Sequence, residues 1–303
     1  MKTVCRVCMH HCSLEPGQRG RCGARKNEGG QIVCENYGQV TSLALDPIEK
    51  KPLRRFRPGS YILSVGSYGC NLRCPFCQNH EISMAFLRKD SVKDNSFGAA
   101  SEEAQGRVGS IYVSPQMLAE KAFAYTKQAG HEGIENIGVA FTYNEPLVGW
   151  EYVRDAARLI KELGMVNVLV TNGTASGEVL EEILPYMDAM NIDLKAFRPE
   201  TYRKFGGNLE VVREFILRAA KSCHVELTTL VVPGENDCEG EMEEEARWIA
   251  SVEKSVEKKI PLHVTRFFPQ YRMTDRAATD VLQVYRLAET AREYLEYVFV
   301  GNC

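Results

Sequence analysis

The chain has 303 residues, a formal net charge of −3, 44% hydrophobic residues and 25% charged residues. This composition excludes a disordered protein and argues against a general nucleic-acid binder, while the length suits one large α/β domain or two smaller ones. Because the chain contains no run of about 18 apolar residues and no apolar leader, we expect a cytoplasmic protein that does not span a membrane.

The first predicted unit covers residues 1–60 and is rich in cysteine. Its four candidate metal ligands are Cys5, Cys8, Cys12 and Cys22, and His10 or His11 could replace one of them. In a reducing cytoplasm, clustered cysteines indicate metal binding more often than disulfides. Zinc and an auxiliary iron–sulfur cluster both accept four thiolates, and free thiols are the alternative. We therefore predict a small metal-binding domain that ends in a basic connector, with five basic residues from Lys50 to Arg57.

The rest of the chain, residues 61–303, alternates predicted strands and helices. The strands are expected at residues 61–65, 136–141, 166–171, 189–194, 225–232, 262–267 and 297–300. Helical patterns lie between them, such as the Ser114-Pro115 pair, which can cap a helix. Repeated strand–helix units favour parallel strands joined by right-handed crossovers. We therefore predict an α/β fold, an incomplete parallel (β/α)6-type TIM-like barrel, with its chemistry at the carboxyl ends of the strands.

Residues 88–110 interrupt this alternation. The stretch is rich in Asp, Ser, Asn, Gly and Glu and poor in apolar residues, so we expect a long surface excursion. An inert insertion and a lid over the site are both compatible with this composition.

A cysteine motif follows the first predicted strand of the barrel. Cys70, Cys74 and Cys77 have the spacing C-x3-C-x2-C, and thiolates are soft ligands that suit zinc or iron–sulfur clusters. A closed structural zinc site needs four ligands, and His80 is the candidate for the fourth. On a four-iron cluster, three thiolates leave one iron without a protein ligand, as a substrate-binding metal site requires. The position directly after a strand favours the open cluster.

This loop resembles that of the radical S-adenosylmethionine (SAM) superfamily, in which an aromatic residue, here Phe76, precedes the last cysteine. Gly69–Cys74 and Cys77–Asn79 resemble the pyruvate formate-lyase activating-enzyme branch. The branch of AmmeMemoRadiSam system radical SAM enzymes is more similar still, over nearly the whole chain. The further matching segments are Cys5–Cys12, Gly20–Gly23, Asp46–Leu53, Pro58–Ser60, Phe141–Pro146, Asn191–Lys195 and Val300–Asn302.

The resemblance implies a [4Fe–4S] cluster held by Cys70, Cys74 and Cys77, with SAM bound at the open iron. Reduction of the cluster by a flavodoxin or ferredoxin-type electron donor would cleave SAM to methionine and a 5'-deoxyadenosyl radical. By analogy with the activating enzymes, that radical would abstract hydrogen from a protein glycyl residue. A small molecule or a different protein side chain is the other possible substrate. Phe76 is expected to lie beside the cofactor.

Polar residues at the ends of three later strands are the other expected SAM ligands. Glu145 can accept hydrogen bonds from the ammonium group, although it can equally cap the helix that follows. In the activating-enzyme branch a Gly-Gly-Glu stands here, and only the glutamate is shared. Asn172 is a candidate, with ordinary turn chemistry as the alternative. Asp193 and Lys195 alternate onto one side of their strand, where they could bind the ribose hydroxyls and the methionine carboxylate, or simply pair with each other.

Two other functional classes compete with the radical enzyme. A passive iron–sulfur electron carrier with a zinc module would prefer a fully ligated cluster and would not need acids at the strand ends. A zinc-ribbon nucleic-acid binder conflicts with the net charge of −3. Because the N-terminal thiols precede the connector and the loop after the first barrel strand has three thiols of its own, we expect the two metal sites to be independent.

Overall fold

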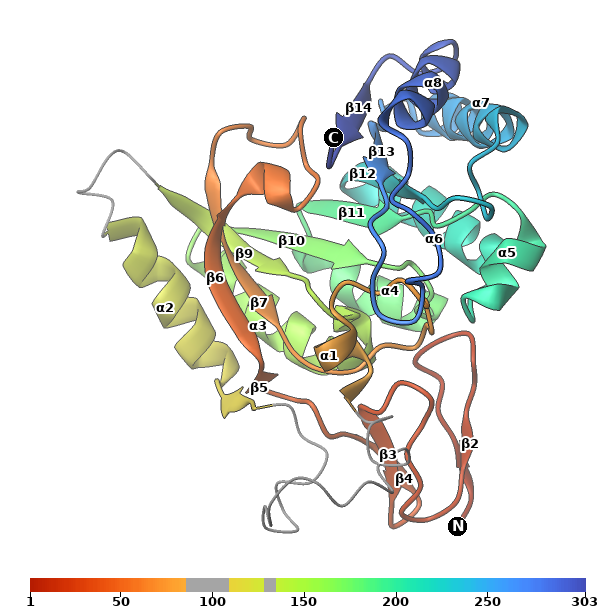
Figure 1. The fold of residues 1–303 in the computed structure, drawn as a ribbon. Coiled ribbons are helices and arrows are strands. Elements are labelled where there is room, and N and C mark those ends of the chain that lie inside the picture. The colour runs from red at the N-terminus through yellow and green to blue at the C-terminus, as the bar shows by residue number, and fades with distance from the viewer. Residues whose placement is uncertain (86–108, 128–134) are drawn as a thin grey trace.

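The computed structural model describes residues 1–85, 109–127 and 135–303, and one sheet of eight strands dominates these ranges (Figure 1). The strands lie in the order β14-β13-β12-β11-β10-β9-β7-β6. Their bounds are β6 (Ser42–Pro47), β7 (Tyr61–Gly66), β9 (Asn136–Phe141), β10 (Val166–Thr171), β11 (Ala189–Asp193), β12 (His224–Val231), β13 (Leu262–Arg266) and β14 (Val298–Gly301). All neighbouring pairs from β7 to β14 are parallel, whereas β6 runs antiparallel to β7. The predicted incomplete parallel barrel is therefore confirmed.

The parallel strands form where the sequence predicts them, to within one residue at each end. Their apolar runs are buried on both faces, as is usual for parallel strands covered by helices. In β10, for example, Val166, Val168 and Leu169 are all buried. Residues 88–108 of the expected excursion lie outside the described residues.

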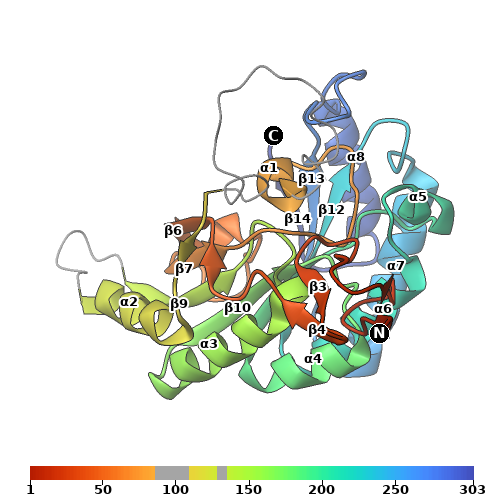
Figure 2. The same cartoon turned by 90° about the horizontal axis from the view of Figure 1, so that it is seen from below.

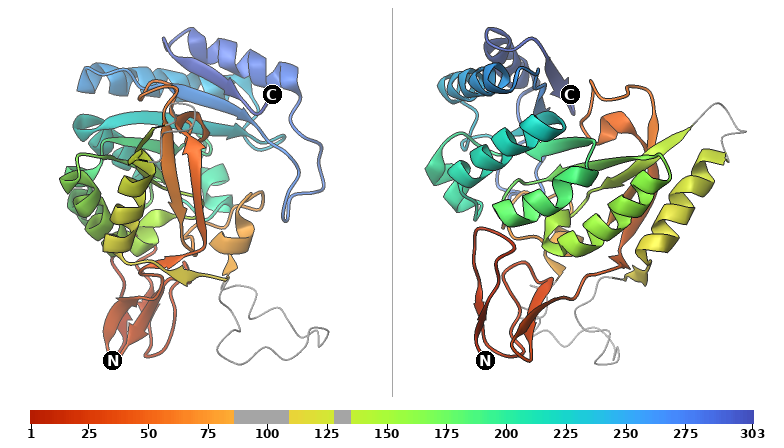
Figure 3. Two further views of the ribbon diagram at one scale, coloured as in Figure 1. Left: turned by 90° about the vertical axis from the view of Figure 1, so that its left-hand side faces the viewer. Right: turned by 180° about the vertical axis from the view of Figure 1, so that it is seen from behind.

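Most of the helices cover the outer face of the sheet, whereas the short α1 lies on the other side, as Figure 2 and Figure 3 show. Their bounds are α1 (His80–Ser83), α2 (Pro115–Lys127), α3 (Trp150–Glu162), α4 (Gly177–Ile183), α5 (Pro199–Lys204), α6 (Leu209–Ser222), α7 (Glu239–Val256) and α8 (Val281–Arg292). The predicted cap of α2 is present, because the backbone N–H of Met117 donates to Ser114 Oγ at 3.1 Å. None of the helices in the described ranges is long and apolar enough to cross a bilayer.

Strand β6 extends the sheet into the segment that the sequence assigns to the N-terminal domain. It pairs with β7 from Ser42↔Gly66 to Pro47↔Tyr61. The sheet thus begins at Ser42, whereas the expected domain boundary lies at residue 60. The proline and charged residues that follow β6 are typical of a connector, so the sequence does not indicate a strand here. β6 is an edge strand whose pairing depends on β7.

The N-terminal segment before β6 forms a lobe of short hairpins at one end of the sheet (Figure 1). The hairpins pair β1 (Thr3–Val4) with β2 (Ser13–Leu14) and β3 (Arg25–Glu28) with β4 (Gln31–Cys34). The last strand before β6, β5 (Gln39–Val40), pairs instead with the distant β8 (Ile111–Tyr112). Arg25 fixes this lobe to the barrel, because its buried guanidinium pairs with Glu151 of α3.

The basic connector closes the end of the barrel at which the parallel strands begin. The backbone N–H groups of Arg54 and Arg55 donate to the carboxylate of Glu226 in β12, at 3.0 and 2.7 Å. Asn191 of β11 donates to the Pro52 carbonyl at 2.9 Å. The connector therefore has a structural role that its composition alone does not reveal.

Candidate functional site

The cysteine loop leaves β7 at the carboxyl end of the sheet. Gly69 opens it with a φ of 94°, a conformation that side chains with a Cβ rarely adopt. A Cβ at this position would also stand 2.7 Å from the Cys22 carbonyl oxygen. Further along, the backbone N–H of Arg73 donates to the Phe205 carbonyl at 2.8 Å. Backbone packing therefore fixes the course of the loop before any metal is considered.

The three loop thiols are neighbours in a desolvated environment. Burial raises the pKa of the Cys70 thiol well above its usual range, and the ionised forms of Cys74 and Cys77 raise it further. Burial also raises the pKa of Cys74 to about 11 and raises that of Cys77. Three such thiols become stable thiolates only next to strong positive charge, which a metal cluster supplies.

The loop thiols do not surround a single ion. In the described part of the chain, no three His, Cys, Asp or Glu side chains converge on one metal position. In a four-iron cluster each thiolate binds a different iron, so its cysteines need not meet at one point. The donor set of three thiols on one short loop therefore fits a cluster better than a mononuclear zinc site completed by His80.

Glu145, at the end of β9, is buried, and its carboxylate accepts three hydrogen bonds. Its Oε1 accepts from Leu147 N at 3.0 Å and Thr171 Oγ1 at 2.7 Å, and its Oε2 accepts from Asn172 N at 2.8 Å. Burial raises the pKa of Glu145 to about 7, although these three hydrogen bonds lower it. The expected helix-capping role is present, since Leu147 lies in the 3-10 turn Pro146–Gly149. The second acceptor position of Oε2 has no partner among the described residues.

Asn172, at the end of β10, joins the cysteine loop to its own turn. Its Nδ2 lies 3.7 Å from Cys70 Sγ and donates to Asn71 Oδ1 at 2.9 Å. Its Oδ1 accepts from the N–H and hydroxyl of Thr174, at 3.1 and 2.6 Å. The residue thus performs the expected turn chemistry and also touches the first cysteine.

Asp193 and Lys195, at the end of β11, form an ion pair of 2.8 Å. Burial disfavours the ammonium, but the Asp193 carboxylate and the Cys74 thiol hold the pKa of Lys195 well above its usual range. The Lys195 charge in turn opposes the rise that burial causes in the pKa values of Cys74 and Cys77. The predicted common orientation of this pair is therefore observed, and it faces the cysteine loop.

Phe76 is buried in the interior. Its ring makes edge contacts with Phe205 and Phe267, at centroid distances of 5.0 and 6.4 Å. This packing fixes the part of the cysteine loop that lies between Cys74 and Cys77.

The loop after β9 contributes two residues that sequence reasoning left unassigned. Asn144 accepts from Ser67 N through Oδ1 and donates to the Gly69 carbonyl through Nδ2, both at 3.0 Å. Tyr143 has a φ of 73°, its carbonyl accepts from Asn79 Nδ2 at 2.7 Å, and its hydroxyl lies 2.8 Å from Asp46 Oδ2. The polar residues directly after a strand indicated a functional loop. Their hydrogen-bond partners are distant in sequence, so the roles of Tyr143 and Asn144 could not be predicted.

The N-terminal thiols lie in one lobe, but within the described ranges no three of them converge on one metal position either. Cys5 and Cys22 are buried, and the backbone N–H of Cys5 donates to the Cys12 carbonyl at 2.9 Å. Burial raises the pKa values of Cys5 and Cys8 and raises that of Cys22 to about 11. Ionised Cys12 contributes to the shifts of Cys5 and Cys8.

Comparisons with known proteins agree with this geometry. The family model described as "Radical SAM superfamily" matches residues 64–248. Uncharacterized protein MJ0808 of Methanocaldococcus jannaschii is 35% identical over 304 residues, covering 99% of this chain and 81% of the relative. The pyruvate formate-lyase-activating enzyme of Clostridium pasteurianum is 23% identical over 238 residues, covering 75% and 89%. Among solved structures, Streptococcus suis SuiB has a TM-score of 0.52 at 13% identity, covering 78% of this chain and 48% of that one, which indicates a shared fold.

Proposed function

Because the chain belongs to the radical SAM superfamily, we propose that Cys70, Cys74 and Cys77 hold a [4Fe–4S] cluster and that the strand ends around them bind SAM. The protein is a radical SAM enzyme similar to the pyruvate formate-lyase activating enzymes. The observation that carries the assignment is that the three loop thiols, of which Cys74 is buried, lie with Glu145 and Lys195 at one end of the barrel. When bound, the cluster supplies the electron that cleaves SAM to methionine and a 5'-deoxyadenosyl radical.

In this proposal, different polar residues bind different groups of SAM. Glu145 Oε2 retains one acceptor position, which suits the ammonium group of the methionine moiety. Lys195 donates to Asp193 Oδ2, so Asp193 Oδ1 remains for a ribose hydroxyl and the other Lys195 hydrogens remain for the methionine carboxylate. Asn172 holds the turn beside Cys70, and Phe76 packs the loop against Phe205.

The proposed substrate is a glycyl residue of another protein. Support comes from the name of the Clostridium pasteurianum relative, an activating enzyme that acts on another enzyme. A reduced flavodoxin or ferredoxin-type protein is the proposed electron donor. A zinc ion or auxiliary iron–sulfur cluster at Cys5, Cys8, Cys12 and Cys22 completes the proposal.

Anaerobic reconstitution with iron and sulfide tests the reaction type. The expected result is production of 5'-deoxyadenosine from SAM after addition of dithionite. A protein that takes up the cluster and transfers electrons but never cleaves SAM would instead be the passive carrier.

Isotope transfer tests the substrate class. Cells that express the protein are grown on α-deuterated glycine, and their extract is divided into proteins and small molecules. Deuterium in the 5'-deoxyadenosine formed with the protein fraction supports a glycyl residue. Hydrogen transfer that requires the small-molecule fraction would overturn the glycyl assignment.

A further inference from the structure

The N-terminal segment lies directly against the cysteine loop, although the sequence predicts two independent units. Two of its side chains reach the same loop carbonyl. His10 Nε2 donates to the Asn71 oxygen at 2.9 Å, and Arg21 Nε donates to it at 3.3 Å. These contacts bring a histidine and an arginine from the first lobe to the residue that follows Cys70.

Arg73 extends the same pattern from within the loop. Its guanidinium donates to the Cys70 carbonyl at 2.8 Å and to the Leu72 carbonyl at 2.7 Å. It also donates to the backbone carbonyl of Arg21. Three consecutive carbonyls, of residues 70, 71 and 72, therefore each accept a hydrogen bond from a basic side chain.

Backbone packing supports these contacts on either side. The Cys22 carbonyl fills the space where Gly69 lacks a side chain. Asn36 Nδ2 donates to the Tyr68 carbonyl at 2.9 Å. Met9 N donates to the Thr174 carbonyl at 3.2 Å, next to the turn of Asn172. The first half of the loop is thus enclosed between the N-terminal lobe and the strand ends.

Among the described residues, the basic side chains at this contact are not paired with carboxylates. Within the described ranges, none of His10, Arg21 and Arg73 has a carboxylate partner, because their hydrogen bonds go to carbonyl groups and, from Arg73, also to Met84 Sδ. Cationic donors beside an anionic thiolate cluster favour its reduced form, since charge and hydrogen bonding set cluster potentials. The positive charges of Arg21 and Arg73 therefore act in the direction that makes reduction easier, whereas burial lowers the pKa of His10, which contributes a hydrogen bond and no charge.

We propose that the N-terminal lobe is a clamp for the cluster loop: His10 and Arg21 are positioning residues that hold the Asn71 carbonyl, and the charge of Arg21 eases reduction of the cluster. This inference rests on the proposed function, because it assumes that the loop carries the cluster. It gives the cysteine-rich lobe a role in the radical reaction itself. The lobe is then part of the active-site wall.

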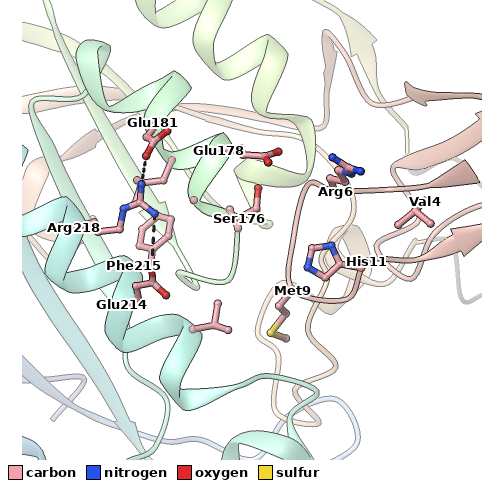
Figure 4. Close-up of a pocket in the computed structure, with 14 residues that line it drawn as sticks. Val4, Arg6, Met9, His11, Ser176, Glu178, Glu181, Glu214, Phe215 and Arg218 are labelled. Atoms are coloured by element: carbon pink, nitrogen blue, oxygen red, sulfur yellow. Dashed lines mark hydrogen bonds and ion pairs between the residues drawn. The ribbon is translucent and has the colours of Figure 1, made fainter.

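The chain offers matched controls one residue away from the clamp or on the same segment. Arg6 and His11 come from the same lobe, but they line a different cavity of about 630 Å³ between residues 4–11 and the helices α4 and α6 (Figure 4). His10→Ala is therefore compared with His11→Ala, and Arg21→Gln with Arg6→Gln. Each pair removes the same side chain from the same lobe.

The first measurement uses protein without the cluster. The amide of Arg73, hydrogen-bonded to Phe205, reports order in the loop through hydrogen exchange. We expect its exchange to be several-fold faster in His10→Ala and Arg21→Gln and unchanged in the two controls. Equal exchange in clamp and control variants would overturn the proposal. A wild-type protein that fails to cleave SAM would defeat the proposed function and leave this exchange result untouched.

The second measurement uses reconstituted protein. Loss of an outer-shell partner typically weakens metal binding about 10- to 100-fold, so we expect cluster loss to a ferrous chelator to accelerate by roughly tenfold or more in Arg21→Gln. Its midpoint potential should fall below that of wild type, while Arg21→Lys, which keeps the charge, should restore the potential. If Arg21→Gln does not fold, His10→Ala carries the test through chelator loss. Wild-type cluster retention in His10→Ala would then overturn the clamp.

Discussion

The carboxylate of Glu145 accepts a hydrogen bond from the backbone N–H of Asn172 at 2.8 Å and so joins the ends of β9 and β10. Because its other oxygen is occupied by Leu147 and Thr171, the remaining acceptor position lies on the oxygen that faces Asn172. The proposed ammonium site is thus fixed by two neighbouring strands.

We expect Glu145→Gln to weaken SAM binding roughly tenfold or more. A charge-assisted hydrogen bond contributes on the order of 1.5–3 kcal/mol, and about 1.4 kcal/mol corresponds to a factor of ten. The measurement is the SAM-induced change in the electron paramagnetic resonance spectrum of reconstituted protein. Iron content should stay normal, and the exposed Glu178→Gln serves as control. Unchanged affinity would leave Glu145 with its capping role alone.

Replacement of Cys70, Cys74 or Cys77 by Ala should abolish both the cluster and SAM cleavage. Three thiolates are the whole protein ligand set of the proposed cluster, so none is spare. Iron and sulfide analysis after reconstitution measures the loss, with Cys303→Ser, an exposed cysteine, as control. Cleavage by two of the three single variants would contradict the ligand assignment.

For the pair of Asp193 and Lys195, we expect Asp193→Asn and Lys195→Gln each to weaken SAM binding by several-fold. The reason is that both groups keep free hydrogen-bonding positions beyond their mutual contact of 2.8 Å. Isothermal titration with SAM gives the affinities, and thermal unfolding of the same samples gives the stability. Variants that lose stability but bind SAM normally would show that the pair is structural only.

Replacing Cys5 and Cys8 together by Ala should remove the proposed N-terminal metal and lower the unfolding temperature. A short cysteine-rich lobe has few side chains with which to build its own core, so the metal stabilises it. Metal analysis of protein purified without added iron measures the loss. A double variant with the metal content and unfolding temperature of wild type would mean that these thiols are free.

We expect the folded protein to lose stability in acid because of Glu226. Burial opposes its ionisation, but hydrogen bonds from His224, His263 and the Arg54 and Arg55 amides lower the pKa of Glu226 from 4.5 to about 2. Since the folded pKa lies below the unfolded one, its stabilising contribution is complete above about pH 4.5 and disappears as the pH falls toward 2. The contribution is of the order of 3 kcal/mol, because one pKa unit corresponds to about 1.4 kcal/mol.

The measurement is urea unfolding of cluster-free Glu226→Gln and wild type between pH 7 and about pH 3. The difference in unfolding free energy should be large at neutral pH and shrink as the pH falls. Glu293→Gln, at an exposed position, should show no such trend. A difference independent of pH would show that the charge of Glu226 is not what stabilises the connector.

The sequence alone determined the strands and the cysteine loop of this protein. Both depend on local patterns: apolar runs of strand length such as Val166–Thr171, and the spacing of Cys70, Cys74 and Cys77. A parallel barrel then places the strand ends at one rim, so Glu145 could be named before the structure was known.

Tertiary structure decided which groups those residues meet. Thr171 lies 26 positions from Glu145, and His10 lies 61 positions from the Asn71 carbonyl that it binds. Strand β6 likewise exists because β7 offers it an edge. A local pattern fixes backbone conformation over a few residues, but a hydrogen bond between distant segments depends on how the whole chain packs. For this reason the clamp on the cluster loop emerges only from the folded molecule.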